Sequence, residues 1–298
     1  MRNLSRQQKG IIALVGYALF ASTIGIFIRE MDNYFSNFQQ VYMRAFVGMV
    51  IAFFLYRKRL SFENISKISK FDLLIMATRV VSLYLFGVVL FTKSITIASY
   101  ANVTFIFALP YSAILGFIIL REKITLKKIT LVGLSLLGVL LVSAKDIFNF
   151  SSWGYGEILA IISAFFYALS SVLRKKLSND LNSFESAFMM LAGGFLLIFI
   201  SSNVAGDDIS QIFSGSLTAY IAVFLAGLSN ALISLCIDYG FKNIEAVKAG
   251  NIIYVESIFA LFISVFLYNQ IPNLQEIFGA LLILMSAILI NSQRNTKI

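Results

Sequence analysis

The chain has 298 residues, of which 59% are hydrophobic and only 13% are charged. Soluble domains are about 45–50% apolar and about 25% charged, so a water-soluble domain of this length would leave too much apolar surface unburied. The composition excludes a disordered, collagen-like or disulfide-rich secreted protein and indicates a protein that crosses a membrane several times. The chain has no histidine and a single cysteine, Cys236. Histidine catalysis, histidine metal sites and an internal disulfide are therefore excluded, and we expect no cofactor and no metal.

Apolar stretches bounded by charged residues follow one another along the chain. A membrane helix needs about 17–25 mostly apolar residues. The candidates cover 11–28, 37–56, 71–92 and 98–120, the stretches between Lys128 and Lys145, Glu157 and Arg174, and Glu185 and Asp207, then 217–237, 245–267 and the stretch between Glu276 and Arg294. The sequence thus predicts an all-α membrane protein with ten transmembrane helices joined by short loops.

The basic residues orient these helices. Arg44 and Arg79 lie within predicted helices. Arg29, Lys93 and Lys145 lie on the side of the membrane where the first predicted helix ends. All other lysines and arginines fall on the opposite side, together with both ends of the chain. An excess of Lys and Arg marks the cytoplasmic side, so we expect a multi-pass protein of the plasma (inner) membrane with both termini in the cytoplasm. The net charge of +9 then reflects topology, and no basic domain remains to bind nucleic acid.

The chain matches itself at an offset of about 146 residues. Like residues then coincide in corresponding helices, as Gly10 does with Gly156, Phe20 with Phe166 and Gly133 with Gly279. These matches predict two five-helix repeats, 11–145 and 154–292, within one integral membrane domain. Because five is odd, the second repeat starts on the other side of the membrane and is inverted. Inverted repeats place a substrate site near the middle of the bilayer and let one part rock against the other.

Three stretches carry a family resemblance. They are 41–56 (VYMRAFVGMVIAFFLY), 77–125, which ends in the acid-bearing turn Arg121-Glu122-Lys123-Ile124-Thr125, and 252–272 (IIYVESIFALFISVFLYNQIP). In their order and spacing they resemble the EamA-type transporters of the drug/metabolite transporter superfamily over nearly the whole chain. The resemblance implies a central cavity lined by the first, third, fourth, sixth, eighth and ninth helices, with the fifth and tenth at the periphery. It also implies transport of amino acids, nucleotide-derived metabolites, drugs or related solutes, often outward.

The second half departs from the family pattern at two places. The family often has proline directly after the position of Glu256, where this chain has Ser257, while Pro110 occupies the equivalent place in the first half. The glycine–glutamate pair that ends the ninth helix is replaced by Tyr268 and Asn269. We therefore expect the kink and the outer turn of the second half to differ from the family.

Glu256 lies about midway along the ninth predicted helix. A charge there costs about 2.5–3.5 kcal/mol on insertion scales, so the side chain should face protein or a water-filled cavity. It is either a proton carrier, a partner for a substrate amine, or a structural carboxyl that is neutral or paired with an arginine. Asn251 and Tyr254 share another face of an ideal helix, well rotated from Glu256. Both faces reach a site only if this helix lies deep in the bundle.

Arg44 and Arg79 are the basic residues within predicted helices. Each either snorkels to its nearer surface or joins an interhelical salt bridge, or else clamps a substrate carboxylate or phosphate. If both arginines and Glu256 reach one cavity, a zwitterionic substrate such as an amino acid is favoured. Asp238, near the inner end of the eighth helix, is interpreted as an ordinary interface residue.

Other polar residues complete the candidate cavity. Asn102 in the fourth helix is either an interhelical contact or a ligand. Pro110 should kink that helix because it removes one backbone hydrogen bond. Tyrosines inside a membrane need hydroxyl partners and favour a polar cavity, and the polar residues at this depth in the first, third, sixth and eighth helices are Tyr17, Tyr84, Tyr167 and Asn230.

The function predicted from these features is a secondary transporter, an exporter of small metabolites such as amino acids or nucleotide-derived solutes that works by alternating access. No Walker A sequence is present, so ATP would not drive it directly. Its partners are the bilayer and a small-molecule substrate, and a homodimer is left open. The alternatives are a non-transporting membrane partner or assembly protein and, less favoured, an intramembrane enzyme, for which the chain offers no nucleophile–base motif.

Overall fold

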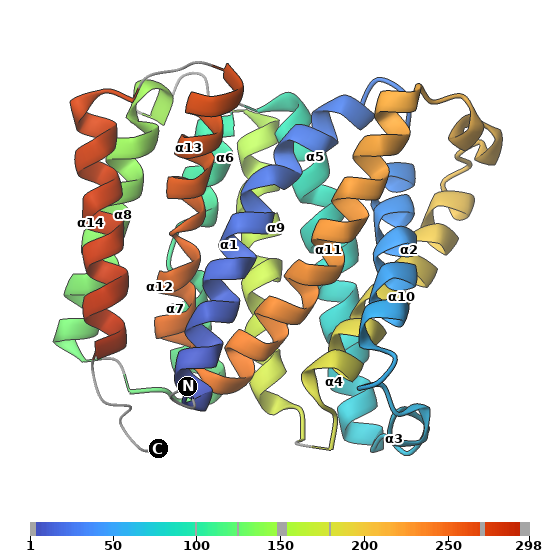
Figure 1. Ribbon diagram of the computed structural model, residues 1–298, viewed down its shortest axis with the longest axis horizontal. Coiled ribbons are helices and arrows are strands. Elements are labelled where there is room, and N and C mark those ends of the chain that lie inside the picture. The colour runs from blue at the N-terminus through green and yellow to red at the C-terminus, as the bar shows by residue number, and fades with distance from the viewer. Residues whose placement is uncertain are drawn as a thin grey trace.

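The computed structural model describes residues 4–98, 100–123, 125–147, 154–178, 180–268 and 272–292. All regular secondary structure in these ranges is helical. The elements are α1 (Arg6–Met31), α2 (Asn37–Tyr56), α3 (Phe62–Ser66), α4 (Lys70–Val80), η1 (Val81–Val88), α5 (Val89–Ile97), α6 (Tyr100–Phe107), α7 (Tyr111–Leu120), α8 (Leu126–Ile147), α9 (Tyr155–Leu173), η3 (Arg174–Lys176), α10 (Ser183–Val204), η4 (Ile209–Phe213), α11 (Leu217–Asn243), α12 (Ala246–Ile253), α13 (Glu256–Tyr268) and α14 (Leu274–Ser292). The long helices form one bundle in which α1 begins and α14 ends at the same end (Figure 1).

Eight helical stretches of the described chain are long and apolar enough to cross a membrane. They agree with the first four and the sixth to ninth predicted spans, and the third is a continuous run of α4, η1 and α5 over Lys70–Ile97. The fifth and tenth predicted spans fall on α8 and α14, which lie outside this set; α14 contributes a shorter apolar helix, Leu274–Ile290. An all-helical membrane-type fold is thus confirmed.

Side chains cap the helix starts, as the sequence requires where four backbone N–H groups lack intrahelical partners. At α2, the Ser36 hydroxyl accepts from the Gln39 N–H at 3.2 Å, while the Gln39 side chain accepts from the Ser36 N–H at 2.9 Å. Asn182 and Glu185 form the same reciprocal box at α10. These capping boxes fix where a long apolar helix begins, which apolar periodicity alone does not.

Two membrane-type helices are interrupted in the middle. In the first half, α6 ends at Phe107 and α7 begins at Tyr111, directly after Pro110. In the second half, α12 ends at Ile253 and α13 begins at Glu256, with Ser257 at the place equivalent to Pro110. The second interruption therefore forms without a proline. The outer turn that the sequence expected to differ includes Asn269, which lies outside the described residues.

Helices of the two halves pair reciprocally. The first helix of each half packs on the third of the other, α1 on α11 and α9 on η1 and α5, while α2 packs on α10 and α8 on α14. The pair α8 and α14 lies at one edge of the bundle (Figure 1). Its backbones approach so closely that a Cβ added to Gly138 would lie 2.7 Å from the carbonyl oxygen of Gly279. Small residues permit this approach and tie the two halves together.

Candidate functional site

A cavity lies within the bundle, and its volume is about 830 Å³ when the adjoining open solvent is included. Its lining comes from α1, η1 with α5, α6, α9, α11 and the α12–α13 interruption, which are six of the predicted spans, and from one residue of α2, Arg44. Neither α8 nor α14 contributes to it.

The cavity gathers six of the polar residues singled out in the sequence: Tyr17, Arg44, Tyr167, Asn230, Tyr254 and Glu256. Tyr254 and Glu256 both line it because the helix breaks between them, which removes the rotation that an unbroken helix would impose. Tyr84, Arg79, Asn102 and Asn251 do not line it.

Glu256 is the first residue of α13 and faces the cavity. A helix N-terminus carries partial positive charge that favours a carboxylate. Among the described residues, its carboxyl group has no hydrogen-bond or ion-pair partner. Tyr17 and Tyr167 lie close enough to interact with it electrostatically. No arginine of the described chain therefore pairs with the Glu256 carboxyl group, which lines the cavity without such a partner.

Arg44 is 1% exposed and does not snorkel to a surface. Its Nε donates to the Gln40 carbonyl oxygen at 3.0 Å and its Nη2 donates to the Thr92 hydroxyl at 2.8 Å. Both partners are uncharged, and in the described chain no carboxylate lies within ion-pair distance. The guanidinium is thus fixed in orientation at the cavity wall while its charge stays uncompensated.

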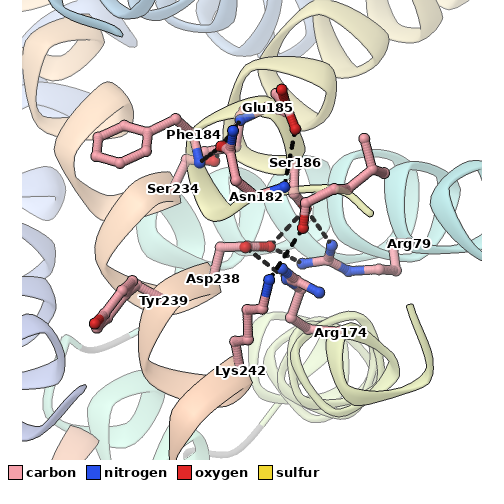
Figure 2. A network of polar contacts seen from close by, with 12 residues as sticks. Arg79, Arg174, Asn182, Phe184, Glu185, Ser186, Ser234, Asp238, Tyr239 and Lys242 are labelled. Carbon is pink, nitrogen blue, oxygen red and sulfur yellow. Dashed lines mark hydrogen bonds and ion pairs between the residues drawn. The ribbon is translucent and has the colours of Figure 1, made fainter. Parts of the chain in front are cut away.

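Arg79 lies in a different place, a polar cluster outside the cavity (Figure 2). Its Nη2 lies 3.0 Å from Asp238 Oδ1, and its Nη1 donates to the Ser186 hydroxyl at 2.9 Å. The other oxygen of Asp238 accepts from Arg174 Nε at 2.5 Å. Asp238 is 1% exposed, so its interpretation as an ordinary interface residue is wrong. Arg79 forms the interhelical salt bridge that the sequence left open as an alternative.

The remaining three candidates also contact protein. The Asn102 side chain donates to Glu157 Oε1 at 2.9 Å, which joins α6 to α9. Asn251 donates to the Ser286 hydroxyl at 2.9 Å and accepts from Ser135, which joins α12 to α14 and α8. Tyr84 lies in η1 and packs closely on Gly194 of α10. The structure therefore places these side chains between helices.

The sequence analysis missed several residues of the site. Thr92 orients Arg44, and Phe91 and Phe107 form an aromatic cluster at the cavity with the predicted Tyr167, with ring centroids 5.0 to 6.1 Å apart. Phenylalanine is too common in this chain for any one to stand out. Thr92 had one usable signal: it lies 146 residues before Asp238, so the repeat makes the two positions equivalent.

Comparison with known proteins decides the family. A profile described as the EamA-like transporter family matches residues 8–144 and again 154–292. The chain belongs to the EamA-like transporter family. Its two-repeat architecture and its transporter-like character follow from that membership. The identification of the sequence as EamA-type is confirmed.

Solved structures show the same fold. One of them, described only as "Crystal structure of protein", superposes with a TM-score of 0.75 over 96% of this chain and 97% of its own, at 13% sequence identity. That likeness concerns the fold alone. A search of curated proteins gives no match. Any specific activity must therefore be argued from the cavity of this EamA-family protein.

Proposed function

We propose that this EamA-family protein is a secondary transporter that exports small zwitterionic metabolites, with amino acids as the first candidates. The observation that carries the proposal is that one cavity contains Arg44 and Glu256, and that no ion pair joins the two groups to each other or to another described residue. A solute with a carboxylate and an ammonium group would compensate both charges. The aromatic cluster of Phe91, Phe107 and Tyr167 offers a surface for its side chain.

Alternating access is supported by the pairing of the two halves. In the proposed architecture, α8 and α14 complete ten membrane spans in two inverted repeats. Gly48 and Gly194, which are 146 residues apart, make corresponding close contacts: Gly48 with Gly227 and Asn230 on α11, and Gly194 with Tyr84 on η1. Asn230 and Tyr84 are also 146 residues apart. Such an arrangement allows rocking of one part against the other around a central site.

The proposed orientation follows from the lysines and arginines. Most basic residues fall on the side of the predicted topology where α1 begins and α14 ends, and we assign that side, with both termini, to the cytoplasm of a cell with this protein in its plasma membrane. Glu256 serves as the partner of the substrate amine, and it would release a proton on binding if it were protonated in the empty cavity. Transport then carries a pH dependence that a structural carboxyl would not produce.

The test is amino-acid flux in proteoliposomes. Vesicles containing the purified protein are loaded with a labelled amino-acid mixture. Their loss of label is compared with that of protein-free vesicles loaded in the same way. Glu256→Gln should abolish or strongly slow the flux, and Asp208→Asn, a change at an exposed loop residue, should not. If the folded protein gave no more flux than protein-free vesicles for any amino acid, the proposal of a zwitterionic substrate would be rejected. A panel of nucleosides and cationic drugs would then decide between another solute and the non-transporting membrane partner.

A further inference from the structure

A second cavity of about 440 Å³ adjoins the first. It is lined by Leu109, Tyr111 and Ser112 at the α6–α7 interruption, by Ala168 and Ser171 on α9, and by Gly250 on α12. The site described above does not use this cavity. Its position relative to the first cavity gives it a role.

Five side chains line both cavities: Tyr17, Phe107, Tyr167, Ile253 and Tyr254. We call these five residues the septum. Along α1, the first cavity continues from Tyr17 to Ala21 and Ile24, away from the start of the helix, whereas the second reaches no further than Tyr17. Since α1 begins at the end of the bundle where α14 ends (Figure 1), the second cavity lies on that side of the septum.

The septum coincides with the two helix interruptions. Phe107 is the last residue of α6, Ile253 is the last residue of α12, and Tyr254 lies in the turn before α13. Interrupted helices lack part of the hydrogen-bond ladder that stiffens a continuous one, and element-terminal residues absorb the dihedral changes of hinges. Three of the five septum residues therefore sit where the backbone can bend most easily.

The two cavities differ in charge. Arg44 and Glu256 line the first, while the described lining of the second contains no charged side chain. Its polar groups are hydroxyls, and that of Ser171 is already bonded to the Tyr167 carbonyl oxygen at 2.9 Å. A charged solute would thus be held more weakly here than in the first cavity. A weakly binding compartment ahead of a stronger site lets a solute move on to that site.

We propose that the second cavity is the cytoplasmic half of the solute path and that the septum is the gate between the two halves. This inference rests on the proposed transport function. A solute to be exported enters the second cavity from the cytoplasm, is held there only loosely, and crosses the septum to Arg44 and Glu256 when the interruptions bend.

Beyond the second cavity its lining helices converge on a polar closure. Glu122, just after α7, accepts from the Ala246 N–H at 2.9 Å at the start of α12. Lys175, which follows α9, lies 3.5 Å from the same carboxylate. The closure joins the ends of α7, α9 and α12 beyond Ser112, Ser171 and Gly250, which line the second cavity on the same three helices. The path therefore has two barriers.

The test is thiol accessibility in a Cys236→Ser background, which removes the single native cysteine. Ser112→Cys and Ser171→Cys probe the second cavity, and Ala21→Cys reports on the first. Ile114→Cys is the matched control, because Ile114 lies on α7 near Ser112 but is 50% exposed on the outer surface of the bundle. The probe is a charged, membrane-impermeant thiosulfonate applied to protein in lipid nanodiscs. Thiolate reactivity requires water access.

We expect Ser112→Cys and Ser171→Cys to react about tenfold faster than Ile114→Cys when an amino-acid mixture is present, because turnover opens the barriers. Without the mixture, Ser112→Cys and Ser171→Cys should each react faster when Tyr167→Ala is added than when Tyr167 is present. Suppose that Ser112→Cys and Ser171→Cys react no faster than Ile114→Cys, while Ala21→Cys reacts and the proteoliposomes show flux. The second cavity would then be a sealed packing void, and the transport proposal would still stand. Absence of flux with a reactive Ala21→Cys would instead reject the transport function itself.

Discussion

Two buried arginines of this protein have opposite surroundings. Arg79 is 3% exposed and its charge is compensated by Asp238, whereas Arg44 is 1% exposed and bonds only to a carbonyl and a hydroxyl. Breaking a buried ion pair is costly, but a buried charge with neutral partners at a cavity wall remains available to a ligand. The partner, and not the residue type or its burial, thus distinguishes the structural Arg79 from Arg44, the proposed binding residue.

The repeat makes this difference sharper. Thr92, the partner of Arg44, and Asp238, the partner of Arg79, lie 146 residues apart and occupy equivalent positions in the two halves. In the second half the Asp238 carboxylate compensates the charges of Arg79 and Arg174. In the first half the Thr92 hydroxyl bonds to Arg44 but does not compensate its charge. The arginines differ between the halves as well, because Met190 is equivalent to Arg44 and Leu225 to Arg79 at the same offset.

The largest expected effect comes from removing the shared acid. Asp238→Asn leaves Arg79 and Arg174 buried without their carboxylate, which should cost about 3–5 kcal/mol of unfolding free energy. Chemical unfolding in detergent micelles measures it. Asp208→Asn is the control, because that carboxylate is exposed and bonds only within its own loop, to Ser210. Equal stability of the two variants would contradict the structural role of the Arg79 cluster.

The two arginines themselves should separate binding from stability. Arg44→Gln keeps a hydrogen-bond donor near Thr92 but removes the charge, so we expect solute binding to weaken about 10- to 100-fold, the equivalent of about 1.5–3 kcal/mol for a charge-assisted bond. Arg79→Gln should lower stability and leave the dissociation constant of the folded protein unchanged. Ligand titration and unfolding on both variants check this. A binding loss in Arg79→Gln as large as in Arg44→Gln would place both arginines in the path.

A double-mutant cycle tests the pairing directly. Arg79→Gln and Asp238→Asn contact each other, so their effects on unfolding free energy should deviate from additivity by about 1–2 kcal/mol. Arg44→Gln combined with Asp238→Asn should be additive within about 0.5 kcal/mol, as for distant sites. Additivity of the first pair would mean that Asp238 acts through Arg174 alone.

The sequence predicted the helical spans well, because a 20-residue apolar stretch leaves a membrane segment little choice but a helix. It placed Asp238 wrongly because a charge near a span end looks the same whether it faces water or a buried arginine 159 residues away. Side-chain partners across helices depend on how each helix is rotated in the bundle. That rotation is set by packing and is not visible in one sequence.

The cavity residues were predicted only in part, because the rotation of each helix is not visible in the sequence. Periodicity separated Tyr254 from Glu256, but the interruption before α13 brings both to the cavity and leaves Asn251 between helices. No proline announces this break. The first half does carry Pro110, so the repeat was the better guide, and a break could have been inferred by transferring it to Ser257, the equivalent place in the second half.

The smallest expected effect and the most specific one both fall on Thr92. Thr92→Val removes the hydroxyl that accepts from Arg44 and should weaken binding by about 1 kcal/mol, the value of one hydrogen bond. Thr92→Asp instead copies Asp238 into the first half. The new carboxylate should pair with Arg44, so binding falls about tenfold while stability holds or rises. If Thr92→Asp bound the solute as tightly as the native protein, the open charge of Arg44 would not be what the cavity uses, and the contrast between the two arginines would describe packing only.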